Sequence, residues 1–220
     1  MLYIVSTPIG NLEDITLRAI RTLKEADYIA AEDTRHTSIL LRKYEIKTQA
    51  LSFHSYSSQS KHDKIIDILK EGKDVALVSD AGTPGISDPA YSLIQQAIRE
   101  EITIVPIPGP SSMLAAVVAS GLPMDKFLYI GFLPLKKGRQ TLLKALAEEK
   151  RTIVLFEAPH RILRTLGDLK EYIGDRKIAV CRELTKLHEE ILRTDVSGAL
   201  EHFTEKKPKG EFVLVVKGST

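Results

Sequence analysis

The stretch DVALVSDAGTPGISDPAYSLIQQAIRE (residues 74–100) decides the fold class of this chain of 220 residues. Residues 74–79 form a short apolar run of the kind found in buried strands, and residues 90–100 carry apolar side chains at helical spacing. The turn SDAGTPGISDP (residues 79–89) holds two glycines, two prolines, two aspartates and three Ser/Thr residues, where an α/β protein turns from strand to helix. So many conformationally special residues in one turn indicate a backbone shaped to approach a ligand closely.

The same alternation extends through the first half of the chain. Short apolar strands separated by helices are typical of a buried, mostly parallel sheet. The pattern predicts strands over residues 2–6, 28–31, 48–53, 74–79 and 102–107, and helices over residues 13–26, 36–44, 60–72, 90–100 and 112–120.

The segment SGLPMDK (residues 120–126) indicates a domain boundary, because the pattern changes after it. We therefore expect an N-terminal α/β domain over residues 1–121 and a C-terminal α/β domain with a mixed sheet over residues 122–220. A ligand is expected between the domains or beyond the carboxyl ends of the strands. For the second domain the predicted strands cover residues 127–133, 151–158, 177–184, 188–196 and 211–218, and the predicted helices cover 139–149 and 160–172.

Composition and the missing fingerprints exclude several classes of protein. The hydrophobic content of 43% and the charged content of 27% are ordinary for a globular protein, and no apolar run is long enough to span a membrane. The N-terminal segment MLYIVSTPIG is interpreted as a first core strand rather than a signal peptide. A single cysteine, Cys181, favours a reducing cytoplasm. Dinucleotide, P-loop and nucleophile-elbow motifs are absent, and no His or Cys spacing indicates a metal site.

Four unusual turns follow four apolar strands: TPIGN (7–11), SDAGTPGISDP (79–89), PGPSS (108–112) and FEAPHR (156–161). In a parallel sheet such turns share one edge, so we expect them to converge. Gly82 and Gly85 allow close backbone approach, and Asp80 can accept hydrogen bonds from hydroxyls or an ammonium group. Ser111 and Ser112 precede a helix, where they serve either an anion or only the helix cap.

Charged residues mark four further segments as well as the FEAPHR turn. In AEDTRHT (31–37), Asp33 or Thr34 is a candidate helix cap, and the cations in the next turn indicate either an anionic partner or only a solvated helix start. In FEAPHR, Pro159 is predicted at the first position of a helix. The segment CRELTKLHEE (181–190) follows a buried strand and is either a solvated surface or a site wall. The lysines of PLKKGRQ (134–140) and EKKPKGE (205–211) either contact phosphates or only aid solubility.

Taken together, the segments STPIGNLEDIT, AEDTRHT, SDAGTPGISDPAY, PIPGPSS, FEAPHRI, CRELTKLHEE and GEFVLVV resemble the ribosomal RNA small subunit methyltransferase I family. The resemblance covers essentially the whole chain. It implies the tetrapyrrole methylase fold, with S-adenosylmethionine in the cleft between two α/β domains. The implied reaction is 2′-O-methylation of a cytidine ribose in the decoding region of small-subunit (16S) ribosomal RNA. Many members continue into a basic helical tail; this sequence stops at Thr220, a departure that bears on RNA affinity and not on the cofactor site.

The resemblance also implies partners and site residues. It implies a homodimer that acts on ribosomal RNA or the ribosomal subunit. We expect this protein to be cytoplasmic, and we expect no DNA, membrane or metal partner. The implied cofactor-binding residues are Pro8, Ile9, Asp80, Gly82, Thr83, Ile86, Ser111, Ser112, Phe156, Ala158, Leu184 and Glu211. Candidates for a general base are Glu32, Asp33, Glu157 and Glu183, and candidates for phosphate or alkoxide contacts are Arg35, Arg161, Arg182 and Lys186.

The expected chemistry is an in-line displacement at the sulfonium methyl group, in which positioning of the ribose oxygen supplies much of the rate. Two alternatives stay open. One is a methyltransferase acting on a tetrapyrrole precursor of the precorrin type, and the other is a non-catalytic RNA-binding protein of the same fold.

Overall fold

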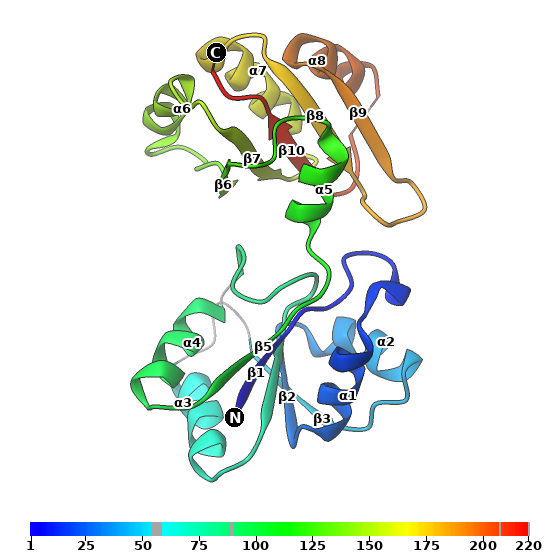
Figure 1. The fold of residues 1–220 in the computed structure, drawn as a ribbon, viewed down its shortest axis with the longest axis vertical. Coiled ribbons are helices and arrows are strands. Elements are labelled where there is room, and N and C mark those ends of the chain that lie inside the picture. The colour runs from blue at the N-terminus through cyan, green and yellow to red at the C-terminus, as the bar shows by residue number, and fades with distance from the viewer. Residues whose placement is uncertain (54–58, 89, 207, 220) are drawn as a thin grey trace. The chain divides into compact units, whose positions relative to one another are not determined.

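The computed structural model describes residues 1–53, 59–88, 90–206 and 208–219, and the chain divides into two compact units, Met1–Ser111 and Ser112–Thr220 (Figure 1). Each unit combines a five-stranded sheet with helices, so the predicted α/β class is confirmed. The division lies ten residues before the expected boundary. The reason is that the helix α5 (Ser112–Ser120) packs on strands of the second sheet, which places it with the second unit.

The first unit is built on a parallel sheet with strand order β3-β2-β4-β1-β5, and every pairing among its described strands is parallel. The prediction of a mostly parallel sheet is therefore confirmed. Its elements are β1 (Leu2–Val5), η1 (Leu12–Asp14), α1 (Leu17–Glu25), β2 (Tyr28–Ala31), α2 (Thr34–Lys43), β3 (Gln49–Ser52), α3 (Gln59–Lys70), β4 (Val75–Val78), α4 (Ala90–Arg99) and β5 (Ile104–Ile107).

Both faces of this first sheet are buried, which explains why its strands are continuous apolar runs. Side chains alternate between the faces of a strand. In β4, Ala76 and Val78 belong to the core under α1 and α2, whereas Val75 and Leu77 belong to the core under α3 and α4. The carboxyl ends of these strands are left as the edge where polar turns gather.

The second unit has a mixed sheet, as predicted, and its strand order is β6-β7-β10-β8-β9. The pair β6–β7 is parallel, and the pairs β7–β10, β10–β8 and β8–β9 are antiparallel. Its elements after α5 are β6 (Phe127–Phe132), α6 (Arg139–Ala147), β7 (Thr152–Glu157), α7 (Ile162–Ile173), β8 (Lys177–Arg182), β9 (Glu190–Asp195), α8 (Val196–Glu205) and β10 (Phe212–Val216).

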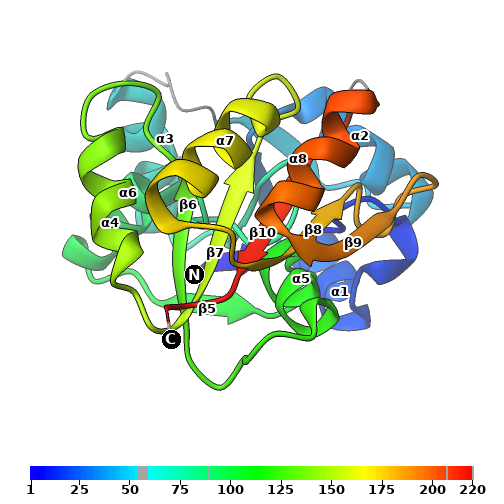
Figure 2. The ribbon, with the colours of Figure 1, turned by 90° about the horizontal axis from the view of Figure 1, so that it is seen from above.

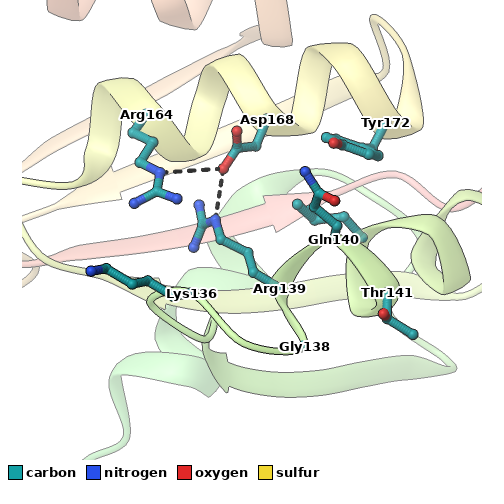
Figure 3. A pocket seen from close by; sticks show the side chains of 9 residues that line it. Lys136, Gly138, Arg139, Gln140, Thr141, Arg164, Asp168 and Tyr172 are labelled. Carbon is teal, nitrogen blue, oxygen red and sulfur yellow. Dashed lines mark hydrogen bonds and ion pairs between the residues drawn. The ribbon is translucent and has the colours of Figure 1, made fainter.

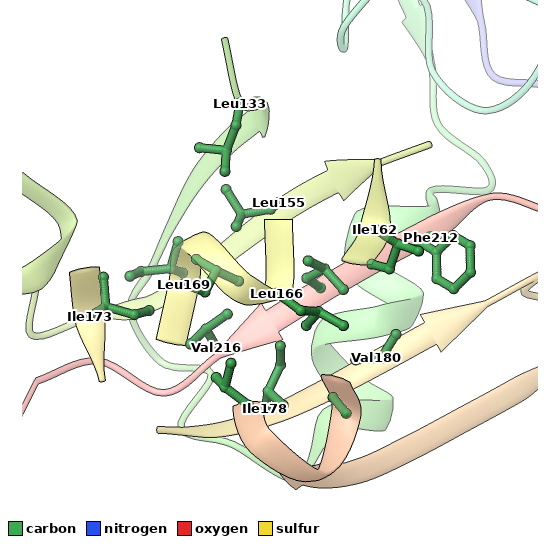
Figure 4. Close-up of a cluster of buried hydrophobic side chains, with 14 of the residues drawn as sticks. Leu133, Leu155, Ile162, Leu166, Leu169, Ile173, Ile178, Val180, Phe212 and Val216 are labelled. Carbon is green, nitrogen blue, oxygen red and sulfur yellow. The ribbon is translucent and has the colours of Figure 1, made fainter. Parts of the chain in front are cut away.

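Three helices cover one face of the second sheet, and α5 lies on the other. Figures 1 and 2 show α6, α7 and α8 side by side on that face, in agreement with their contacts. The core beneath them is drawn in Figure 4, where Ile162 of α7 lies beside Phe212 of β10, and Leu166 and Val216 belong to the same cluster. None of the helices in the described ranges combines the length and the apolarity needed to cross a membrane.

Three local predictions need correction. The first predicted helix begins at Leu17, because Thr16 caps it by accepting a hydrogen bond from the Ala19 N–H at 3.0 Å. Pro159 is not the first residue of α7, since residues 159–161 form a turn and the helix begins at Ile162. The helix α8 was not predicted at all.

Candidate functional site

Three of the four unusual turns meet at the carboxyl edge of the first sheet, as predicted. The strands β4, β1 and β5 are neighbours, so the turns that follow them lie next to one another. The turn after β1 and the turn after β4 are joined by a pair of backbone hydrogen bonds between Thr7 and Gly82, with N···O distances of 2.9 and 3.0 Å. The fourth turn, FEAPHR, follows β7 in the second unit and does not share this edge.

The turn after β4 depends on its glycines. Gly82 and Gly85 have φ angles of +79° and +93°, which L side chains rarely adopt. A Cβ atom on Gly82 would also lie 3.5 Å from Ile9 and 3.8 Å from the Pro110 carbonyl oxygen. Asp88 stabilises the end of the turn, because it accepts hydrogen bonds from the N–H groups of Gly85 and Ala90 at 2.7 and 2.9 Å. Pro89, the last residue of this turn in the sequence, lies outside the described residues.

Hydroxyl groups complete this edge. The Ser6 and Thr83 hydroxyl oxygens are 2.8 Å apart, and the Thr7 hydroxyl donates to the Ser79 carbonyl at 3.2 Å. Gly109 lies so close to Ser6 that a Cβ atom there would be 3.0 Å from the Ser6 Cβ. Sequence reasoning missed Ser6, whose signal was its place at the end of the first predicted strand.

The turn after β4 also carries a carboxylate group, that of Asp80. Asp80 accepts a hydrogen bond from the Asp33 N–H at 3.0 Å, and its own N–H is 3.5 Å from a carboxylate oxygen of Glu32. The His36 ring nitrogen Nδ1 is 3.9 Å from Asp80 Oδ1. The structure thus brings the segments AEDTRHT and SDAGTP together, because β2 and β4 are adjacent. The side chain of Asp80 keeps 43% of its surface exposed.

Asp33 is committed to neighbours on its own helix. It caps α2 by accepting a hydrogen bond from the Arg35 N–H at 2.8 Å, and the Arg35 guanidinium bonds both of its oxygens at 3.2 and 2.8 Å. These hydrogen bonds from Arg35 hold the pKa of Asp33 well below its usual range. The carboxylate is therefore a weak proton acceptor, while the Arg35 side chain stays 91% exposed.

In the second unit, the FEAPHR turn is organised around a buried carboxylate. Glu157 ends β7 with its side chain fully buried. Its oxygens accept from the Ala158 N–H at 2.8 Å and the Thr165 hydroxyl at 2.5 Å, and Arg161 Nε lies 3.2 Å away. Arg161 also donates to the Leu133 carbonyl. Glu157 is thus engaged by the protein itself, and sequence reasoning missed its partner Thr165.

The segment after β8 is a strained loop. Glu183 and Thr185 have φ angles of +51° and +66°, which is rare for residues other than glycine and most unusual for a β-branched side chain. Lys186 Nζ lies 2.9 Å from Glu183 and 2.8 Å from Glu211, so these three predicted residues do come together. Burial opposes ionisation of Glu183, but the hydrogen bonds from Lys186 and the Glu211 N–H prevail and lower its pKa. Within the described residues, the buried Thr185 hydroxyl has no hydrogen-bond partner.

The remaining predicted residues are distributed over both units. Pro8 and Ile9 are buried in the turn after β1, and Ile86 is 42% exposed in the turn after β4. Ser111 ends the first unit and Ser112 begins α5. Phe156 packs edge-on against Tyr129 and Phe132, with ring centroids 5.2 and 5.8 Å apart. In the second unit, Ala158 and Leu184 follow β7 and β8 respectively, and Arg182 Nε pairs with Glu190 at 2.9 Å.

Comparison with known proteins places this arrangement among methyltransferases. Residues 1–199 match the model of the tetrapyrrole (corrin/porphyrin) methylases. The chain is 54% identical over 217 residues to ribosomal RNA small subunit methyltransferase I of Thermotoga maritima, covering 99% of this chain and 98% of that protein. It is 49% identical to the protein of the same name from Synechocystis, covering all of this chain and 80% of the relative.

A solved structure supports the fold. The X-ray structure of cobalt precorrin-4 methyltransferase, a cobalamin biosynthetic enzyme, superimposes with a TM-score of 0.72 at 22% identity. The match covers 97% of this chain and 93% of that one. At this level of identity the likeness extends to the fold alone.

Proposed function

The chain belongs to the tetrapyrrole methylase family, and from that premise we propose that it is an S-adenosylmethionine-dependent methyltransferase of small-subunit ribosomal RNA. The observation that carries the proposal is the 54% identity to a relative of that name over nearly the full length of both chains. We further propose that the target is a cytidine 2′-hydroxyl and that the active form is a cytoplasmic homodimer, as the family resemblance implies.

The carboxyl edge of the first sheet fits the cofactor. S-adenosylmethionine supplies an electrophilic methyl group on a sulfonium when bound, and it also presents an ammonium, a carboxylate and two ribose hydroxyls. Asp80 is a partly exposed carboxylate that suits the ammonium or the hydroxyls. Gly82 suits close contact with the backbone, since its φ angle of +79° is one that residues with a side chain rarely adopt. Thr83 and Ser111 add polar groups at the same edge.

The second unit supplies the remaining proposed contacts. Phe156 stands in an aromatic group with Tyr129 and Phe132, which suits the adenine ring. We propose that Leu184 and Ala158 contribute apolar surface there. We propose that Thr185, in the loop after β8, also contacts the cofactor. Its buried hydroxyl lacks a partner among the described residues, and its backbone is strained.

The geometry favours catalysis by positioning over catalysis by a strong base. Asp33 and Glu183 have pKa values below their ordinary range, and Glu157 is enclosed by Arg161 and Thr165. We therefore propose that Glu157 positions the FEAPHR turn and does not accept the substrate proton. Exposed Arg35 is proposed to contact an RNA phosphate, for which a bidentate guanidinium is well suited.

The test combines cofactor binding with methyl transfer. Titration calorimetry with S-adenosylmethionine is expected to show binding that Asp80→Asn weakens at least tenfold, while Asp67→Asn on the exposed face of α3 leaves it unchanged. Incubation of the wild-type protein with unmethylated small subunits and labelled cofactor is then expected to label the RNA at an alkali-resistant linkage. Such resistance is the mark of a blocked 2′-hydroxyl.

Each alternative corresponds to a distinct result. Cofactor binding with label transferred to a precorrin, and none to RNA, would assign the chain to tetrapyrrole chemistry. RNA binding without any cofactor binding would leave a non-catalytic RNA-binding protein. Unchanged cofactor affinity in Asp80→Asn would remove the carboxyl edge of the first sheet from the cofactor site.

A further inference from the structure

A polar cavity of about 250 Å³ opens between α6 and α7 in the second unit. Lys136, Arg139 and Arg164 line it together with one carboxylate, Asp168, and the first turn of α6 (Figure 3). None of these residues belongs to the cofactor set or to the proposed catalytic groups.

The floor of this cavity is formed by a buried side chain, Arg139, that hydrogen bonds hold in place. Arg139 is only 3% exposed, and its guanidinium donates to Asp168 at 2.7 Å, to Thr165 at 2.8 Å and to the Pro134 carbonyl at 3.1 Å. A guanidinium held by three partners keeps one orientation, so less conformational entropy is lost when a ligand binds. Figure 3 shows Asp168 between the side chains of Arg139 and Arg164.

The charge balance of the cavity favours an anion. Lys136, Arg139 and Arg164 contribute three positive charges, and Asp168 contributes one negative charge. Arg164 is 59% exposed and lies 3.9 Å from Asp168, so its guanidinium is not fixed by a close hydrogen bond there. The first turn of α6 adds the positive end of a helix dipole. The cap residue, Gly138, has no side chain that could accept a hydrogen bond from the N–H groups of this turn.

The chemistry of the lining favours a phosphate over an apolar metabolite. Pockets for small organic molecules are lined mainly by apolar and aromatic groups. Here charged and polar groups predominate, and Lys137 adds a further cation in the same exposed loop.

We propose that this cavity binds a phosphodiester group of the ribosomal RNA substrate. The proposal rests on the proposed function and adds to it a phosphate contact outside the cofactor set. Lys136 and Arg164 supply mobile cations at the rim, and Arg139 supplies a fixed cation at the floor. The contact is electrostatic, so it contributes affinity that falls with salt and carries no base specificity.

The test uses the exposed rim, because substitution of buried Arg139 would disturb the core. The variant is Lys136→Gln/Arg164→Gln. The matched control is Lys144→Gln/Lys170→Gln, which removes the same charge from exposed positions of α6 and α7 outside the cavity lining. Affinity for a decoding-region RNA fragment is measured over a series of salt concentrations, and cofactor affinity and methyl transfer are measured in parallel.

The expected result is an RNA affinity about tenfold weaker in the rim variant, with the slope of log K against log salt reduced by about 0.7, the value for one single-strand phosphate contact. The control is expected to change both quantities much less, and cofactor affinity is expected to stay at the wild-type value in both. Equal RNA affinity and slope in rim and control variants, with wild-type methyl transfer intact, would overturn the proposal and leave the proposed function standing.

A second arm separates RNA from a small phosphate compound. Binding of inorganic phosphate and ribose 5-phosphate is followed by NMR in the wild type and the rim variant. Loss of that binding without any change in RNA affinity would overturn the RNA assignment in favour of a small ligand. Failure of the wild type to bind or methylate RNA would reject the proposed function and the phosphodiester proposal with it.

Discussion

At the scale of single residues, the loop after β8 shows how one glycine supports a strained site. Gly210 has a φ angle of +87°, and a Cβ atom there would lie 2.4 to 2.6 Å from the Glu183 side chain. Glu183 is in turn held by Lys186 and by the Glu211 N–H, both at about 3 Å. The glycine therefore leaves the space that the Glu183 side chain occupies.

Gly210→Ala is expected to destabilise the protein by about 2 to 3 kcal/mol, because it combines backbone strain with displacement of Glu183. Gly72→Ala at the end of α3 is the matched control, since Gly72 has a φ angle of +83° but nothing lies within 4 Å of the position that a Cβ atom would take there. The control is expected to cost only the strain of about 1 kcal/mol. Urea denaturation measures both, and equal losses would show that the Glu183 contact contributes nothing.

Glu190 gives the protein a pH-dependent contribution to stability. Burial raises its pKa, but Arg182 and His202, at 2.9 and 2.8 Å, prevail and hold the folded-state pKa below the ordinary value of 4.5. A lowered folded-state pKa means stabilisation that is present above the unfolded-state pKa. It is lost as the pH falls below about 4.5 and through the folded-state value.

Glu190→Gln is expected to lower the free energy of unfolding by about 1 kcal/mol at pH 7, as for a partly exposed ion pair. The gap between wild type and variant should shrink as the pH falls below 4.5. Denaturant titrations at pH 7, 5 and 3 measure it. A difference in the free energy of unfolding that stays constant over this pH range would show that the ionised carboxylate of Glu190 is not the source of the stabilisation.

At the scale of elements, a buried polar network joins α6, α7 and β7. Thr165 of α7 donates to Glu157 at the end of β7 and accepts from Arg139 at the start of α6. The same helix contributes Leu166 and Leu169 to the core. The network therefore fixes the FEAPHR turn and the floor of the α6–α7 cavity through one hydroxyl.

Thr165→Val is expected to destabilise the protein by about 2 kcal/mol, because it keeps the shape and leaves a buried carboxylate and a buried guanidinium each short of one partner. Thr141→Val on the exposed side of α6 is the control and should change stability by less than about 0.5 kcal/mol. A loss in Thr165→Val no greater than in the control would mean that water or another group replaces the hydroxyl.

At the scale of the whole molecule, the chain has separate cores in its two units, and its one cysteine lies in the second. Cys181 is fully buried in β8, and burial raises the pKa of its thiol to about 11. A thiol that is both enclosed and protonated reacts slowly, because the thiolate is the nucleophile. It therefore reports on opening of the second unit.

Native protein at pH 8 is expected to react with a thiol-specific reagent far more slowly than the urea-unfolded chain. The rate should rise at a lower urea concentration in Thr165→Val than in the wild type, since both residues belong to the second unit. A spectrophotometric thiol assay over a urea series measures this. Rapid labelling in the absence of urea would show that β8 opens in the native state.

Much of the fold was predictable, because the apolar pattern records which faces are buried. The strand over residues 28–31 and the helix over residues 112–120 were predicted with their observed bounds. The helix α8 was missed, although Asp195 caps it and Val196, Ala199 and Phe203 are its buried residues. Gly198 argued against a helix in the sequence, because glycine has a low helix propensity. The structure requires glycine there, because a Cβ atom would lie 2.4 Å from the Thr194 hydroxyl.

The sequence by itself determined the two-part α/β organisation, the family and the chemical types present in each turn, since local pattern and composition are written along the chain. Only the tertiary structure decided which groups are already engaged. The Asp33 carboxylate is paired with Arg35, and the Glu157 carboxylate is bound by Thr165 and Arg161. The tertiary structure also decided that Arg139 is a buried part of the α6–α7 cavity. Burial and hydrogen bonding depend on segments far apart in sequence, so no local pattern specifies them.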